Sequence, residues 1–235
     1  NYARSVPTTQ GYCIFTYIPG NCIDIAPDNT IHVSPRKPAI LSIAAVFISP
    51  QAIATVRVRT IAAKSPFPRL YSCSRAGTYF VLKALKEMNK WEKPEIICPA
   101  YTFFSVPWAA KLAGWELRFA DVLDKDLTLD PESFERQINE KTKAVIVTHL
   151  NGKPAKMVDI AHISRGKNLR ILEDCAHATG LEIDGKPIGS WDIGCFRFGD
   201  RKNLATFGGG IITTSDPELA VALKNLTSRF SEQSK

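Results

Sequence analysis

From Leu70 onward, short runs of apolar residues alternate with longer segments in which apolar residues recur at helical spacing. Ala144–Val147 is a fully apolar run of the first kind, and Tyr79–Met88 is an amphipathic segment of the second. Strands that alternate with helices along a chain are typical of α/β proteins, in which helices connect parallel strands and cover both faces of the sheet. The alternation therefore predicts an α/β fold with a mainly parallel sheet.

The same pattern assigns a range to each expected element. Helices are expected over 79–88, 105–113, 131–138 and 157–165, with a last helix from Pro217, and strands over 95–98, 116–120, 144–147, 169–172, 193–198 and 211–214. Asp130 and Asp216 each precede a proline, so each pair combines an N-cap side chain with the residue best suited to the first helical position.

Residues 1–65 follow a different pattern. They contain prolines at positions 7, 19, 27, 35, 38 and 50, and short runs of Ile and Val without helical periodicity. Ser65–Pro68 then holds two prolines one residue apart, which interrupt helices and sheet ladders alike. We therefore expect two parts, an N-terminal segment of unknown role over 1–65 and a large α/β domain over 66–235.

Charge narrows the classes of partner. The chain carries 30 Lys and Arg against 23 Asp and Glu, a net charge of +7 that favours anionic ligands. Basic residues are dense only at Val56–Arg59, without the aromatic-interleaved stripe of nucleic-acid-binding proteins, so nucleic acid is not expected as a partner. The long uncharged run Ala39–Val56 falls short of the roughly 20 apolar residues of a membrane span, so a membrane is not expected either.

The six cysteines lie far apart and form no C-x-x-C pair. This spacing fits neither a disulfide framework nor a zinc site, for which His149, His162 and His177 do not supply the missing ligands either. We therefore expect reduced thiols, a cytoplasmic protein and no bound metal.

Polar residues that follow strands are the first candidates for a binding site, because ligands bind at the carboxyl ends of the strands of parallel α/β sheets. Asp174 and His177 follow the strand over 169–172, and Lys202 follows the strand over 193–198. Considered singly, Asp174 is better explained as a helix cap and Lys202 as a solvated surface residue.

Two further candidates are an aromatic turn and a helix start. Phe103 lies in the aromatic-rich turn after the strand over 95–98, where it could form a stacking wall or simply pack in the core. Ser74 and Arg75 lie before the helix over 79–88, where backbone amides and the helix dipole suit a phosphate, although ordinary capping explains the same residues.

Four motifs, in this order, resemble the DegT/DnrJ/EryC1/StrS family of pyridoxal-phosphate-dependent aminotransferases. They are Cys98–Phe103, Thr148–Ala155, Glu173–Gly180 and Phe196–Asn203, the last followed by Gly208–Gly210. The resemblance covers residues 70–220 and implies a fold-type-I aminotransferase large domain with pyridoxal 5′-phosphate as cofactor. It also implies a homodimer.

The resemblance implies a role for several residues. Lys202 matches the lysine that forms an imine with the cofactor, and Asp174 matches the carboxylate that pairs with the pyridine nitrogen. Phe103 matches the ring-stacking aromatic, and His177 the polar residue beside the ring.

The phosphate site departs from the family pattern. Ser74 and Arg75 match its phosphate loop, whereas a shifted match selects Gly77 and Thr78. Arg197 stands where the family usually has a phosphate-binding serine. Arg197 either contacts the phosphate or points away toward a carboxylate such as Asp192 or Asp200.

The function that the resemblance implies is transfer of an amino group, from glutamate, to a keto-sugar nucleotide in polysaccharide or cell-surface sugar biosynthesis. The alternative is a catalytically inactive, truncated protein of the same fold, because the family's small C-terminal domain is missing after Lys235.

Overall fold

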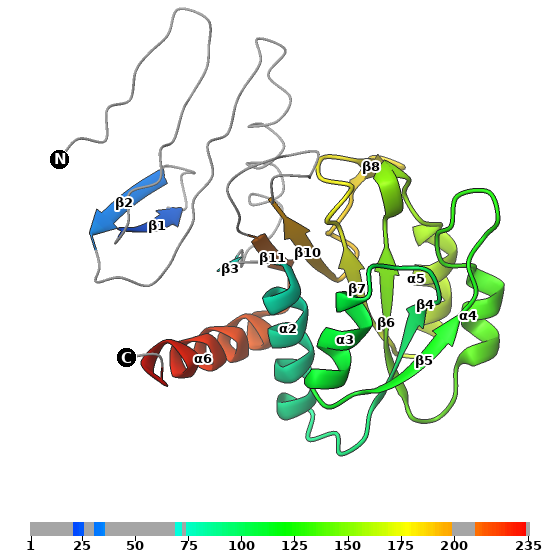
Figure 1. The fold of residues 1–235 in the computed structure, drawn as a ribbon, viewed down its shortest axis with the longest axis horizontal. Helices are drawn as coiled ribbons and strands as arrows, with labels where there is room; N and C mark the ends of the chain where they lie inside the picture. The colour runs from blue at the N-terminus through cyan, green and yellow to red at the C-terminus, as the bar shows by residue number, and fades with distance from the viewer. Residues whose placement is uncertain (1–20, 26–30, 36–68, 72–73, 199–209, 234–235) are drawn as a thin grey trace, which may run out of the picture.

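The computed structural model describes residues 21–25, 31–35, 69–71, 74–198 and 210–233, with side chains over 76–198 and 210–227. These residues contain a mixed seven-stranded sheet in the order β3-β11-β10-β7-β6-β4-β5 (Figure 1). Its strands are β3 (Arg69–Tyr71), β4 (Glu95–Pro99), β5 (Glu116–Ala120), β6 (Thr142–Thr148), β7 (Arg170–Asp174), β10 (Ile193–Arg197) and β11 (Gly210–Thr214). The strands from β10 to β5 pair in parallel, and β11 is antiparallel to both neighbours. The expected α/β fold with a mainly parallel sheet is confirmed.

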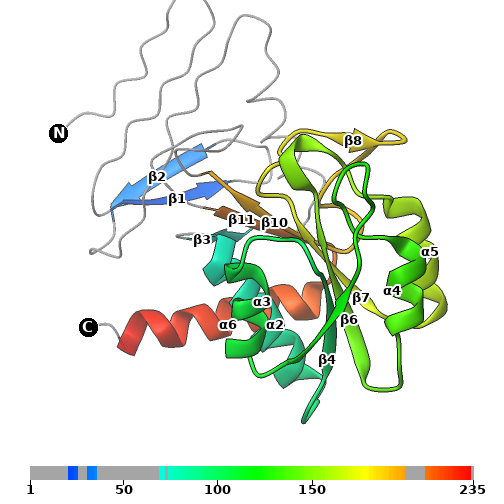
Figure 2. The ribbon, with the colours of Figure 1, turned by 45° about the vertical axis from the view of Figure 1, so that its right-hand side comes forward.

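Helices cover both faces of this sheet (Figures 1 and 2). One face carries α2 (Ser74–Met88), α3 (Ser105–Leu112) and α6 (Pro217–Gln233), and the other carries α4 (Pro131–Gln137) and α5 (Met157–Gly166). Because side chains alternate along a strand, neighbouring residues of β6 enter different cores: Ile146 packs toward α2 and α3, and Val147 toward α4 and α5.

The expected elements are found with small shifts at their ends. The largest shift is in α2, which begins at Ser74, five residues before the expected helix over 79–88. Small residues make this extension possible, since a Cβ at Gly77 would lie only 3.3 Å from the side chain of Ile212 on β11. The first turn of α2 therefore packs closely against the sheet.

Two small antiparallel pairs were not expected. In the N-terminal segment, β1 (Asn21–Ile25) pairs with β2 (Ile31–Pro35). Further on, β8 (Glu182–Ile183) pairs with β9 (Lys186–Pro187). The loop between the latter is Asp184-Gly185, with φ angles of 50° and 73°, a pair typical of a two-residue hairpin turn.

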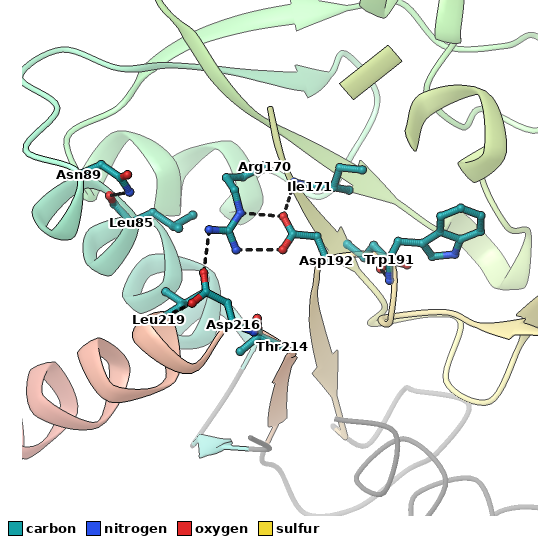
Figure 3. Close-up of polar contacts among 10 residues, drawn as sticks. Leu85, Asn89, Arg170, Ile171, Trp191, Asp192, Thr214, Asp216 and Leu219 are labelled. Carbon is teal, nitrogen blue, oxygen red and sulfur yellow. Dashed lines mark hydrogen bonds and ion pairs between the residues drawn. The ribbon is translucent and has the colours of Figure 1, made fainter. Parts of the chain in front are cut away.

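Arg170 joins the amino ends of two strands and a helix (Figure 3). Its Nε and Nη2 donate to Asp192 at 2.8 and 2.9 Å, and its Nη1 donates to Asp216 at 3.0 Å. Asp216 also accepts from the backbone N–H of Leu219, so it caps α6 as its position before Pro217 predicts. This cluster lies at the edge of the sheet opposite to the carboxyl ends of the strands.

Gly194 in β10 and Gly189 in the segment before it bring backbone against backbone. A Cβ at Gly194 would lie 2.5 Å from the Cα of Gly189 and 2.5 Å from Oγ1 of Thr213. Thr213 in turn donates a hydrogen bond of 2.6 Å to the carbonyl oxygen of Gly189. The segment before β10 is therefore held directly against the sheet.

Among the described helices, none combines the length and apolar character needed to cross a membrane.

Candidate functional site

A pocket lies at the carboxyl ends of β6, β7 and β10, where parallel sheets bind ligands. It encloses about 560 Å³, including open solvent at its mouth. Its lining comprises Thr78, Phe103, Ser105, Val106, Thr148, His149, Leu150, Asp174, Ala176, His177 and Arg197. Four of the site residues predicted from the sequence therefore share one pocket, namely Asp174, His177, Phe103 and Arg197.

Asp174 is the last residue of β7 and sits level with the ends of the neighbouring strands. Its register partners are Thr148 on β6 and Cys195 on β10. The backbone N–H of Ala176 donates to Oδ1 of Asp174 at 3.1 Å, a local turn that fixes the carboxylate in place. Among the described residues that line the pocket, Asp174 thus supplies a carboxylate whose orientation is set by the backbone.

Burial raises the pKa of the Cys195 thiol, and the Asp174 carboxylate adds to this shift. Cys195 therefore stays protonated beside Asp174 and contributes no second negative charge to this end of the sheet.

His177 follows Asp174 by three residues and faces the same pocket. The backbone N–H of Asn151 donates to its Nδ1 at 3.4 Å. A ring nitrogen that accepts carries no proton, so Nε2 of the neutral ring is a donor. Asn151 reaches this position in a left-handed conformation, with φ of 52°.

Phe103 lies after β4 with 54% of its surface exposed, which is unusual for a large aromatic residue. Its ring packs against Phe104 at a centroid distance of 4.8 Å and also lines the pocket. An exposed aromatic ring beside a pocket can stack on a flat ligand.

Arg197 ends β10 on the same face of the sheet as Cys195, two residues earlier, and lines the pocket. The alternative in which Arg197 pairs with Asp192 is wrong. Five residues of strand separate the two by roughly 16 Å, beyond the reach of an arginine. Asp192 instead binds Arg170. Asp200, the other partner considered, lies outside the described residues.

The helix start proposed for a phosphate lies close to this pocket. Ser74 and Arg75 form the first turn of α2, and their side chains are outside the described part of the structure. Thr78, which the shifted match selects, is buried and lines the pocket. Lys202 also lies outside the described residues.

The sequence interpretation missed several residues of the pocket wall. Thr148 and His149 are the clearest cases, although both follow directly after an expected strand and open one of the four motifs. The hydroxyl groups of Thr148 and Thr102 lie 2.9 Å apart. The signal in the sequence is that both are polar residues directly after a strand, although neither is an acid or a lysine.

A buried group of His149, Glu173 and Cys175 lies behind the pocket, with potential ligand atoms within 4.8 Å of one another. Backbone N–H groups already donate to the histidine and to the carboxylate. Burial raises the pKa of the Cys175 thiol, so that this thiol stays protonated. These contacts are those of a hydrogen-bond network and not of a metal site.

Comparison with protein families supports a relationship over most of the chain. A model described as the DegT/DnrJ/EryC1/StrS aminotransferase family matches residues 71–234. The chain is 38% identical over 160 residues to the UDP-N-acetyl-3-dehydro-alpha-D-glucosamine 3-aminotransferase of Acidithiobacillus ferrooxidans. This match covers 67% of the chain and 43% of the relative, so the chain spans less than half of that protein's length.

Solved structures show the same fold. DesV of S. venezuelae, determined with a ketimine intermediate, has a TM-score of 0.64 at 28% identity, over 72% of this chain and 46% of DesV. The GDP-4-keto-6-deoxy-D-mannose-3-dehydratase of E. coli, determined with bound hydrated PLP, has a TM-score of 0.66 at 25% identity, over 74% of this chain and 45% of the dehydratase. The fold is thus that of large domains in pyridoxal-phosphate proteins.

Proposed function

Because the chain belongs to the DegT/DnrJ/EryC1/StrS aminotransferase family, we propose that it forms the cofactor-binding part of a pyridoxal-phosphate-dependent sugar aminotransferase. The observation that carries the proposal is the placement of Asp174. Its oriented carboxylate shares a pocket with an exposed aromatic ring and an arginine.

The residues of the pocket fit pyridoxal 5′-phosphate, which carries a basic ring nitrogen, a flat ring and a phosphate. Asp174 would accept the N–H of the ring nitrogen and keep that nitrogen protonated. Phe103 would stack on the ring, and Nε2 of His177 would donate to an oxygen of the ring. Arg197 would bind the phosphate through charge-assisted hydrogen bonds. When bound, the cofactor supplies an electron sink for the substrate carbon.

We assign the covalent attachment of the cofactor to Lys202, whose amine is the group that can form an imine. Lys202 follows β10 and precedes the glycine triplet Gly208–Gly210. The phosphate would also contact the first turn of α2, through Ser74, Arg75 or, in the shifted match, Gly77 and Thr78. Of these last two, Thr78 is in the pocket wall.

For the substrates, we propose glutamate as amino donor and a nucleotide-linked keto-sugar as acceptor, in polysaccharide or cell-surface sugar biosynthesis. The curated relative from A. ferrooxidans is named for a UDP-linked dehydro sugar, which supports this class of acceptor. We further propose a homodimer and a cytoplasmic location. The described cysteines Cys98, Cys175 and Cys195 are free thiols, as in reducing compartments.

The alternative is a protein of this fold without catalytic activity. It has support from Arg197, which replaces a hydroxyl of the family pattern by a larger charged group. An inactive protein could retain the cofactor, so binding alone does not separate the two functions. The separating measurement is amino transfer from glutamate to the bound cofactor.

The test of cofactor binding is chemical. The chain mixed with pyridoxal phosphate should turn yellow, and borohydride should fix the label on one lysine, which mass spectrometry should identify as Lys202. Lys202→Arg should abolish the label, whereas Lys167→Arg, at the exposed end of α5, should not. A label on another lysine would remove Lys202 from the proposal, and no label at all would remove the cofactor.

A further inference from the structure

Glu173 directly precedes Asp174 on β7, and it is completely buried. Successive side chains of a strand point to opposite faces, so Glu173 points away from the face that Asp174 occupies. A buried carboxylate costs several kcal/mol unless hydrogen bonds replace the lost water. The hydrogen-bond partners of Glu173 therefore need to account for its burial.

Three N–H donors surround this carboxylate. Oε2 accepts from the backbone N–H of Gly189 at 2.8 Å, and Oε1 accepts from the backbone N–H of Trp191 at 2.8 Å. Nε2 of His149, a residue that is also completely buried, lies 3.2 Å from Oε2. Gly189 and Trp191 precede β10, whereas His149 follows β6. Glu173 thus connects the loops on both sides of β7.

The contacts of His149 determine where the protons lie. The backbone N–H of Ala155 donates to Nδ1 of His149 at 3.1 Å, so Nδ1 carries no proton. A neutral imidazole must then carry its proton on Nε2, which donates to Glu173. All three groups that hydrogen-bond to the carboxylate are donors, so a proton on Glu173 would find no acceptor among these three. The pair is therefore a carboxylate and a neutral histidine.

His149 belongs to the wall of the pocket beside Asp174. Its backbone N–H also donates to the carbonyl oxygen of Asp174 at 3.1 Å. We propose that Glu173 is a positioning residue, which holds the His149 ring in one tautomer against the pocket and holds the start of β10, the strand that carries Arg197. The inference rests on the proposed function only for the identity of the molecule that the pocket binds.

The first test reads the His149 tautomer in the chain without cofactor, by NMR of protein labelled with nitrogen-15 in histidine. His149 should show a single neutral form protonated on Nε2, whereas the exposed His162 on α5 serves as reference for a ring that exchanges between tautomers. The variant His149→Gln assigns the signal. In Glu173→Gln, the His149 signal should show exchange between the two neutral tautomers. A proton on Nδ1 in the native chain, or an unchanged signal in Glu173→Gln, would overturn the proposal.

The second test is a double-mutant cycle on the affinity for pyridoxal phosphate. Glu173→Gln and His149→Gln should each weaken binding of pyridoxal phosphate by about tenfold or more. Because the two residues act as one unit, the double variant should lose no more affinity than the single variant with the larger loss. Glu182→Gln, at an exposed position of β8, removes the same charge and should bind as the native chain does.

The outcomes separate the two proposals. If the native chain binds no pyridoxal phosphate, the proposed function fails, and the NMR test still decides the role of Glu173. If the native chain binds and both single variants bind equally well, the positioning role is wrong. If Glu173→Gln does not fold by circular dichroism, His149→Gln decides the outcome, because it leaves both backbone donors on Glu173.

Discussion

Arg170 and Asp192 form a two-point ion pair across neighbouring strands, with Nε to Oδ2 at 2.8 Å and Nη2 to Oδ1 at 2.9 Å. Only about a quarter of either side chain is exposed, at 25% and 23%. Asp192 also accepts the backbone N–H of Ile171, and Arg170 reaches on to Asp216 at the start of α6 (Figure 3). The pair therefore fixes where β7, β10 and α6 begin relative to one another.

Replacement of Arg170 by Ala should lower the free energy of unfolding by about 1–3 kcal/mol, because it leaves two partly buried carboxylates without their shared partner. Urea denaturation measures the change. Arg136→Ala removes a surface guanidinium that is 65% exposed and should change stability by less than about 1 kcal/mol. Equal effects of the two substitutions would contradict a specific role for Arg170.

Glu95 gives the stability a pH dependence of known sign. The Asn139 side chain donates to its carboxylate at 2.7 Å and lowers its pKa from the ordinary 4.5, and Arg118 at 3.0 Å acts in the same direction. Because the pKa of Glu95 is lower in the folded state than in the unfolded state, its carboxylate stabilises the fold at pH values above the unfolded-state pKa. This contribution is lost as the pH falls through the folded-state pKa.

Glu95→Gln should therefore be less stable than the native chain near pH 7, by about 1 kcal/mol. The difference should shrink as the pH falls below 4.5, the ordinary pKa of the carboxyl. Urea unfolding at several pH values measures it. The control Glu116→Gln changes an exposed residue of β5 and should show a small difference at every pH. A stability difference between the native chain and Glu95→Gln that grows as the pH falls would contradict the direction of the pKa shift.

Asp174→Asn should still bind pyridoxal phosphate but lose amino transfer by orders of magnitude, since an amide cannot hold the proton on the ring nitrogen. The spectral change of the bound cofactor on addition of glutamate follows the first half of the reaction. Asp159→Asn, at an exposed position of α5, should leave that change intact. Unaltered turnover in Asp174→Asn would remove Asp174 from the mechanism.

Arg197→Ser and Arg75→Ala should each weaken pyridoxal phosphate binding by about 1.5–3 kcal/mol if both guanidinium groups contact the phosphate, the range for hydrogen bonds to charged groups. Titration of the cofactor against each variant measures the loss. Arg165→Ser removes an exposed positive charge from α5 and serves as the control for long-range attraction. Equal or tighter binding by Arg197→Ser would show that the pocket only tolerates this arginine.

Most of the fold was predictable because strand and helix periods differ and because prolines and cap residues mark the helix starts. Asp130 illustrates the point, since its carboxylate accepts from the N–H groups of Glu132 and Ser133, as the Asp-Pro pair predicts. The start of α2 was not predictable, because small residues such as Gly77 read as a loop until the packing of Ile212 against them is known. The β8–β9 pair was missed because its strands have two residues each.

The pocket residues were predictable where polar side chains directly follow one strand, as Asp174 and His177 do. The role of Glu173 was not, because its donors come from the backbone of Gly189 and Trp191 and from a histidine on another strand end. Backbone N–H groups have no signature in the sequence. A Glu-Asp pair after a strand therefore indicates two similar acids, although the two side chains face different surroundings.

The contact between Gly189 and Gly194 has a consequence for how this sequence can vary. Because a new Cβ at Gly194 would meet the Cα and the carbonyl oxygen of Gly189 at 2.5 and 2.6 Å, no change in a neighbouring side chain can make room for it. A saturation library at position 194 should therefore return only glycine, and a screen for second-site suppressors should return none.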